Sequence, residues 1–183
     1  SIADLKGKRV AVGAAGSGAE ANARQILEAY GITYDDIDEQ YLSFGEAASA
    51  LKDGNVDAAF VTAGFPTAAV QDITSQNKVR LLPIDPDKAD ALIAKYPFYT
   101  KSVIPAGTYG GFDEEVPAVS VMAILIATDK VDEKLGYDIT KALFNNIDKL
   151  QAAHSAAKQI TKDTAKNGMS IELNAGADRY YKE

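Results

Sequence analysis

The chain has 183 residues and a formal net charge of −7, and 46% of its residues are hydrophobic. This apolar share is ordinary for a globular core and argues against intrinsic disorder. The negative charge argues against DNA or RNA as a partner, because nucleic-acid binding needs a basic face that neutralises phosphates. The chain has no Cys, so the sequence excludes disulfides, thiolate metal sites and cysteine nucleophiles.

The first hundred residues alternate strand-like and helix-like patterns. Short apolar or β-branched runs predict strands over residues 9–12, 39–42, 57–62 and 79–84. Helical spacing predicts helices after residues 18, 45, 65 and 85, the second of them opened by a Ser-x-x-Glu capping box at Ser43 and the third carrying Pro66 in its first turn. This order predicts an α/β fold, with a parallel sheet covered by helices on both faces.

The pattern changes after Pro97. Residues 98–104 look extended, residues 105–111 form a Pro/Gly-rich turn or crossover, and residues 119–127 are a further apolar strand candidate. From Lys134 an apolar stripe at helical spacing runs as far as Ile160. We therefore predict two lobes, residues 1–104 and 105–183.

Three loops within residues 1–104 are candidates for a binding site: residues 13–18, 43–46 and 62–67. In an open parallel sheet the loops that leave the carboxyl ends of the strands share one edge, where ligands bind. Each loop also delivers a helix N-terminus, whose free N–H groups favour an anion such as a carboxylate. The alternative interpretation is that these are ordinary tight turns with capping residues.

Signs of catalysis are sparse. The order Gly-x-x-Gly-x-Gly in residues 13–18 matches neither the dinucleotide fingerprint nor the P-loop, although a small α/β nucleotide-binding enzyme stays an alternative. His154 is the only histidine and sits in a helical pattern, so the sequence predicts no metal site and no catalytic residue. We expect a binding protein without a cofactor rather than an enzyme.

Motifs along the whole chain resemble the TAXI family of solute receptors, which serve tripartite TRAP transporters. Each motif is short, and their order and spacing carry the resemblance. They are Asp4 to Gly13 with Gly16-Ser17-Gly18, Tyr41 to Ala47, Leu51 to Gly54, Asp57 to Phe60, Thr62 to Thr67, Val79 to Ile84, Ile104 to Tyr109, Asn167 to Ile171, and Ala175 to Tyr181.

The resemblance implies a type II periplasmic-binding fold that closes over a small carboxylate or amino acid, often glutamate-like, and hands it to a TRAP membrane permease. By position it places Ser17, Gly18, Thr62, Ala63 and Gly64 in the cleft and Tyr109 near the crossover. Family members often carry Thr where this chain has Ala19, which removes one hydroxyl donor. The candidate ligand-binding residues are therefore Ser17, Gly18, Ala19, Ser43, Thr62, Ala63, Gly64 and Tyr109.

The resemblance also implies that residues 1–104 are the second lobe of the receptor, and that residues 105–183 are the crossover and only the returning, C-terminal portion of its first lobe. We then expect the uncovered late helices to pair with the missing N-terminal segment or with a second copy of the chain. It further implies a periplasmic or extracytoplasmic location, although the chain itself opens on Ser1 without a signal peptide. An ABC-type type II binding protein for a precursor or an anion is the alternative with the same fold.

Overall fold

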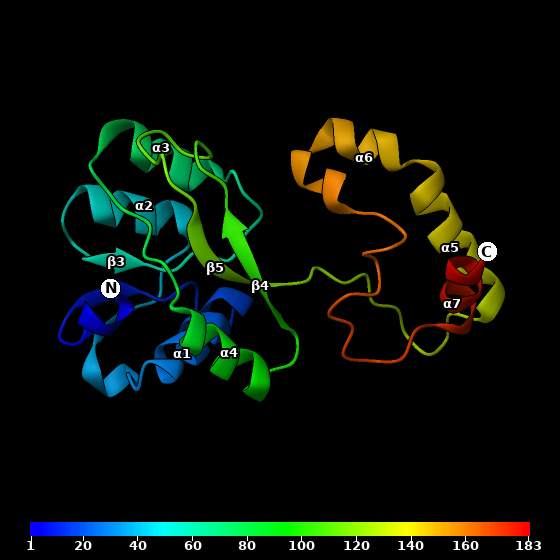
Figure 1. Ribbon diagram of the computed structural model, residues 1–183, viewed down its shortest axis with the longest axis horizontal. Helices are drawn as coiled ribbons and strands as arrows, with labels where there is room; N and C mark the ends of the chain where they lie inside the picture. The colour runs from blue at the N-terminus through cyan, green and yellow to red at the C-terminus, as the bar shows by residue number, and fades with distance from the viewer. The chain divides into compact units, whose positions relative to one another are not determined.

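The computed structural model describes residues 1–183, apart from the side chain of Ser155. The chain forms two compact units, residues 1–120 and 121–183 (Figure 1). The lobes predicted at 1–104 and 105–183 stay a prediction. The elements of the first unit are the 3-10 helices η1 (Ile2–Leu5) and η2 (Tyr34–Asp36), the strands β1 (Arg9–Ala11), β2 (Asp38–Gln40), β3 (Ala58–Ala59), β4 (Tyr99–Ile104) and β5 (Val116–Val121), and the helices α1 (Gly18–Ala29), α2 (Phe44–Lys52), α3 (Ala68–Gln76) and α4 (Pro86–Lys95).

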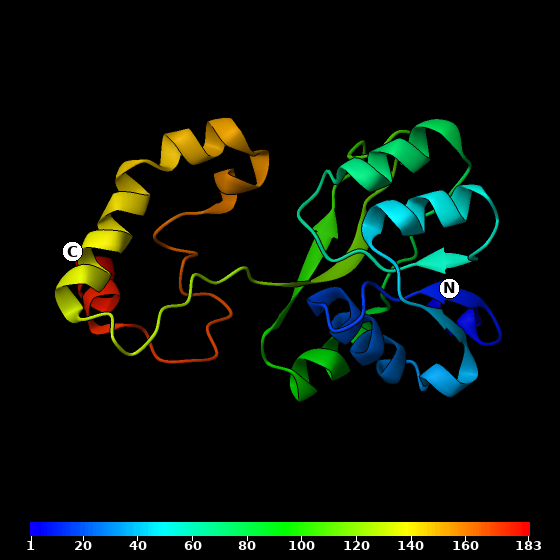
Figure 2. The same ribbon diagram turned by 180° about the vertical axis from the view of Figure 1, so that it is seen from behind.

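A parallel sheet with the order β2-β1-β3 is the centre of the first unit. Both faces of β1 are buried: Ala11 packs with Ala47 of α2 and with Val56, whereas its neighbours Val10 and Val12 point to the opposite face because side chains alternate along a strand. Figures 1 and 2 show α2 and α3 together on one side of the unit and α1 and α4 together on the other. The predicted α/β class with a parallel sheet is confirmed.

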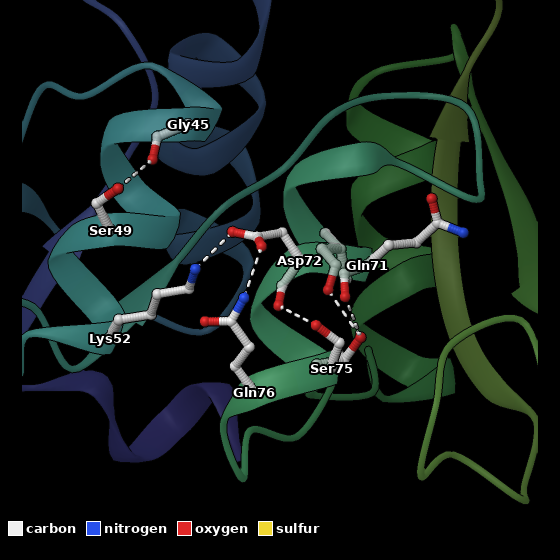
Figure 3. Close-up of polar contacts among 9 residues, drawn as sticks. Gly45, Ser49, Lys52, Gln71, Asp72, Ser75 and Gln76 are labelled. Carbon is white, nitrogen blue, oxygen red and sulfur yellow. Dashed lines mark hydrogen bonds and ion pairs between the residues drawn. The ribbon is translucent and has the colours of Figure 1, made fainter.

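Polar contacts hold α3 beside α2. Lys52 of α2 forms an ion pair with Asp72 of α3 at 2.5 Å (Figure 3). Gln76, one turn further along α3, donates to the same carboxylate at 3.2 Å. Ile73, the residue after Asp72, is buried. These contacts tie the middle of α3 to the C-terminal end of α2.

Three sequence predictions for the first unit need correction. Residues 79–84 form no strand, and only Ile84 makes a sheet-like bond, from its N–H to the carbonyl of Pro117 at 3.0 Å. Pro83 has no N–H to donate, which limits any ladder at this place. The third strand is only Ala58–Ala59, and α3 starts at Ala68 with Thr67 as its N-cap, so Pro66 precedes the helix instead of opening it.

The predicted strand over residues 119–127 is also displaced. The strand is Val116–Val121, which pairs with β4, and residues 122–127 have no strand partner among the described residues. Leu125 and Ile126 are 71% and 72% exposed there. Apolar β-prone residues are not sufficient for a strand, because a strand needs a neighbour to satisfy its backbone.

The second unit is helical. Its elements are α5 (Glu133–Asn145), α6 (Ile147–Ala153), the 3-10 helix η3 (Ser155–Gln159) and α7 (Ala175–Lys182). The predicted continuous helix is therefore interrupted at Asn146 and His154.

Two glycines let α5 and α7 approach closely. A Cβ at Gly136 would collide with the side chain of Asn174, and a Cβ at Gly176 would collide with the backbone of Glu133 and Tyr137. Beside this contact Phe144 stacks on Tyr180 with ring centroids 5.6 Å apart. Backbone-to-backbone packing and an aromatic cluster thus join the two helices.

Candidate functional site

The carboxyl ends of β1, β2 and β3 meet at one edge of the sheet, since all three strands are parallel and β1 lies in the middle. The loop after β1 therefore lies between the loops after β2 and β3. The three predicted loops are brought to this common edge, and each leads into a helix, α1, α2 or α3. This edge is the candidate binding site.

The first loop turns sharply at Gly13, whose φ is 103°, and Gly13 lies so close to the start of α1 that a Cβ would touch Ala19 and the amide of Glu20 at 3.0 Å. Ser17 is the N-cap of α1, and its hydroxyl accepts from the Glu20 N–H at 3.2 Å. Gly18 is exposed with open space around it, whereas Ala19 is buried. Gly18 can therefore face a ligand, and Ala19 instead packs the helix start.

The second loop contains a closed capping box. Ser43 donates its hydroxyl to Glu46 at 2.6 Å and its backbone N–H to the same carboxylate at 2.8 Å, and its hydroxyl accepts from the Glu46 N–H at 3.4 Å. These bonds hold the pKa of Glu46 below its ordinary value, with the bond from the Ser43 hydroxyl as the main cause. Ser43 is thus committed to its own helix, as the alternative interpretation of these loops expects.

The third loop exposes Thr62, Ala63 and Gly64. It is closed by Thr67, which donates its hydroxyl to the carbonyl of Gly64 at 2.7 Å. Tyr109 is buried, and its hydroxyl accepts from the backbone N–H of Thr67 at 3.1 Å. Tyr109 therefore contacts the third loop through Thr67. The sequence did not indicate this contact, because the two residues are 42 positions apart.

Backbone amides are the main polar groups available at this edge. The amides of Gly18 and Ala19 at α1, and of Ala68 and Ala69 at α3, have no acceptor among the residues that the structure describes. No charged residue occurs in residues 12–17, 41–43 or 60–67. Free amides at helix N-termini carry partial positive charge, so this arrangement can attract an anion without a cationic side chain.

Glu20 is the acidic residue nearest to these amides in sequence, and it is buried. It accepts from Arg24 at 2.5 Å and from the hydroxyl of Tyr34 at 2.9 Å. The bond from Arg24 is the main reason that the pKa of Glu20 is lowered, and burial of Tyr34 is the main reason that its pKa rises to about 12. The negative charge of Glu20 is thus paired with the positive charge of Arg24. The sequence analysis missed this cluster because Arg24 belongs to α1 and Tyr34 to η2.

Other features carry less chemistry. A hollow of about 180 Å³ lies between α1 and α4, away from the strand ends, and its charged residues Glu28 and Lys95 pair with each other at 2.6 Å. Among the described residues no group of His, Asp or Glu is arranged to hold a metal ion. In the same part of the chain no helix has both the length and the apolar character needed to cross a bilayer.

Comparison with known families identifies the chain. A model described as the NMT1-like family matches residues 1–183. The chain belongs to the NMT1-like family. The TAXI assignment is finer than this match and stays a prediction.

Among solved structures, the NMT1-like chain is similar to the periplasmic aliphatic sulphonate binding protein SsuA from Escherichia coli. The TM-score is 0.42 and the sequence identity is 19%, over 98% of this chain and 47% of SsuA. The chain thus spans about half of the length of that protein.

Proposed function

We propose that this chain is the ligand-binding part of a periplasmic-type solute-binding protein, which recognises a small anion and does not catalyse a reaction. One observation carries the proposal: two helices, α1 and α3, begin from loops at the same sheet edge, with unbonded N-terminal amides and no charged residue in those loops. Membership of the NMT1-like family supports it.

The ligand class follows from this chemistry. The unbonded amides and the hydroxyl of exposed Thr62 are uncharged hydrogen-bond donors. They therefore suit a negatively charged ligand group that is rich in acceptors. A carboxylate is the simplest such group, and we keep the predicted carboxylate or amino acid, glutamate-like in the TAXI reading, as the ligand. Exposed Gly18 and Gly64 give the ligand access to the backbone.

The transporter class is a separate question. A TAXI receptor delivers its solute to a TRAP permease driven by an ion gradient, whereas the alternative, an ABC-type binding protein, serves an ATP-driven permease. The comparisons agree better with the ABC-type alternative, because neither the family match nor the SsuA match is described as a TRAP receptor. Either partner implies an extracytoplasmic place of action, which belongs to the same proposal.

A nucleotide-binding enzyme is the competing class. It would need a basic side chain or a metal at the phosphates, and residues 12–17 contain no charged residue. The proposal therefore predicts that ATP and NAD do not protect the chain against thermal unfolding. Stabilisation by either nucleotide would favour the enzyme instead.

Native mass spectrometry of the purified chain, followed by denaturation, tests the proposal directly. We expect a released organic acid or amino acid, and the mass distinguishes a carboxylate from a sulphonate. Bare protein that also gains no thermal stability from a panel of amino acids, dicarboxylates and sulphonates would contradict the proposal.

Replacing Gly18 tests the location of the site. A Cβ at Gly18 meets nothing within 4 Å and its φ is not left-handed, so Gly18→Leu adds a side chain over the free amides without strain. We expect at least about 10-fold weaker binding of the released solute, with the unfolding temperature unchanged. Gln76→Leu, at the opposite end of α3, is the control and should leave the affinity unchanged. Equal affinity in all three proteins would place the site elsewhere.

A further inference from the structure

Helices α3 and α4 begin in an unusual way. Neither N-cap residue, Thr67 or Asp85, uses its side chain to cap the helix. Instead the backbone N–H of each N-cap donates to a tyrosine hydroxyl from a distant part of the chain: Thr67 to Tyr109 at 3.1 Å, and Asp85 to Tyr30 at 2.8 Å. Each of these helices therefore has its first residue held by a tyrosine.

Tyr109 is itself firmly held. It is 5% exposed, and it lies in the connection between β4 and β5, within residues 105–112. That turn is closed on itself, because the N–H of Gly107 donates to the carbonyl of Phe112 at 2.7 Å and the hydroxyl of Thr108 donates to the carbonyl of Pro105 at 2.7 Å. A rigid turn thus presents the Tyr109 hydroxyl.

The loop of residues 62–67 has one internal hydrogen bond and few backbone hydrogen bonds to the rest of the first unit. Thr67 uses its hydroxyl within the loop, on the carbonyl of Gly64. From residue 61 to residue 66 no backbone amide has an acceptor among the described residues. The bond to Tyr109 is therefore the polar link that fixes the loop to the rest of the first unit at the point where α3 begins.

We propose that Tyr109 is a positioning residue for the loop of residues 62–67 and does not itself contact the ligand. Its hydroxyl fixes Thr67, the residue immediately before Ala68 and Ala69, and so sets the position of the free amides of α3. Tyr30 does the same for the start of α4. The role of Tyr109 in binding rests on the proposed function, whereas its hold on the loop does not.

Two matched variants test the hold, Tyr109→Phe and Tyr30→Phe. Each removes one hydroxyl and keeps the ring. Amide hydrogen exchange, followed residue by residue by NMR without any solute, is the measurement. We expect Tyr109→Phe to accelerate exchange at Thr67 by about 2- to 12-fold, the loss of one hydrogen bond, and to leave Asp85 unchanged. Tyr30→Phe should do the reverse.

Global unfolding is monitored in the same spectra by Val12, whose N–H donates to the carbonyl of Gln40 in the central sheet at 3.0 Å. Its exchange should not change in either variant. The proposal is overturned if Thr67 keeps its exchange rate in Tyr109→Phe, or if Thr67, Asp85 and Val12 all accelerate equally, since Tyr109 would then act only as a core residue. The result does not depend on a ligand, so it stands apart from the outcome of the solute-release experiment.

Discussion

The two units of this chain bury their apolar residues very differently. Among the described side chains, the buried apolar residues lie almost wholly in residues 1–120, and only Ala157 and Tyr180 belong to the second unit. Conversely, most of the exposed large apolar residues belong to the second unit, with Leu125 and Ile126 the most exposed of all. The first unit therefore has a hydrophobic core of its own, and the second depends on the close contact of α5 with α7.

Charge is divided in the same way. Residues 121–183 contain equal numbers of acidic and basic residues, so the net charge of −7 sits on residues 1–120. The candidate site is thus a locally uncharged edge on the acidic unit. A surrounding negative field disfavours anions at long range, so the affinity for an anionic solute must come from short-range amide bonds.

The largest expected effect contrasts the same truncation in the two units. Leu27 is fully buried, so Leu27→Ala should cost about 2–5 kcal/mol through lost burial and the cavity that remains. Leu125→Ala should stay within about 0.5 kcal/mol, because Leu125 is already exposed to water. Urea denaturation followed by circular dichroism measures both. Comparable losses in the two variants would refute the difference between the units.

The next effect concerns glycines. Gly176→Ala places a methyl group against the backbone of α5 and should cost about 1–3 kcal/mol by forcing the two helices apart. Gly45→Ala in α2 is the control, since its Cβ meets nothing within 4 Å, and it should be neutral or slightly stabilising. Thermal unfolding of the two variants gives the comparison. A harmless Gly176→Ala would mean that α5 and α7 do not pack as closely as described.

The smallest effect concerns the ion pair between Arg9 and Asp57, at the N-terminal ends of β1 and β3. Asp57 accepts from the Arg9 backbone N–H at 3.0 Å and from its guanidinium at 2.8 and 3.1 Å. The bonds from the guanidinium are the main cause that lowers the pKa of Asp57 from 3.8 to about 2. Because the charged form is favoured in the folded state, its stabilisation is present above about pH 4 and is lost as the pH falls toward 2.

Asp57→Asn should therefore lower the unfolding temperature slightly at pH 7, and this difference should shrink steadily as the pH falls from about 4 through 2. Thermal melts across this range measure it. As a second check, Arg9→Gln should move the pKa of Asp57 back toward its ordinary value in an NMR titration. A stability difference that is as large at pH 2 as at pH 7 would mean that the shape of the Asp57 side chain, and not its charge, carries the effect.

The candidate site was predictable in part. The capping box at Ser43 and the meeting of three loops at one edge follow from a local pattern and from the rule for parallel strands, and the structure has both features. The role of Tyr109 was not predictable, because its partner Thr67 is 42 residues away. Nor was the burial of Ala19, which depends on the approach of Gly13.

The sequence by itself determined the α/β class and the positions where α1, α2 and α4 begin. The caps of α1 and α2, the proline in the first turn of α4 and helical spacing all act within a few residues. Only the tertiary structure decided which apolar runs became strands. Residues 79–84 and 122–127 have suitable side chains and form no strand, while β5 begins earlier than its most apolar stretch. The physical reason is that a helix satisfies its own backbone, whereas a strand must find its hydrogen bonds on a neighbour brought there by the rest of the fold.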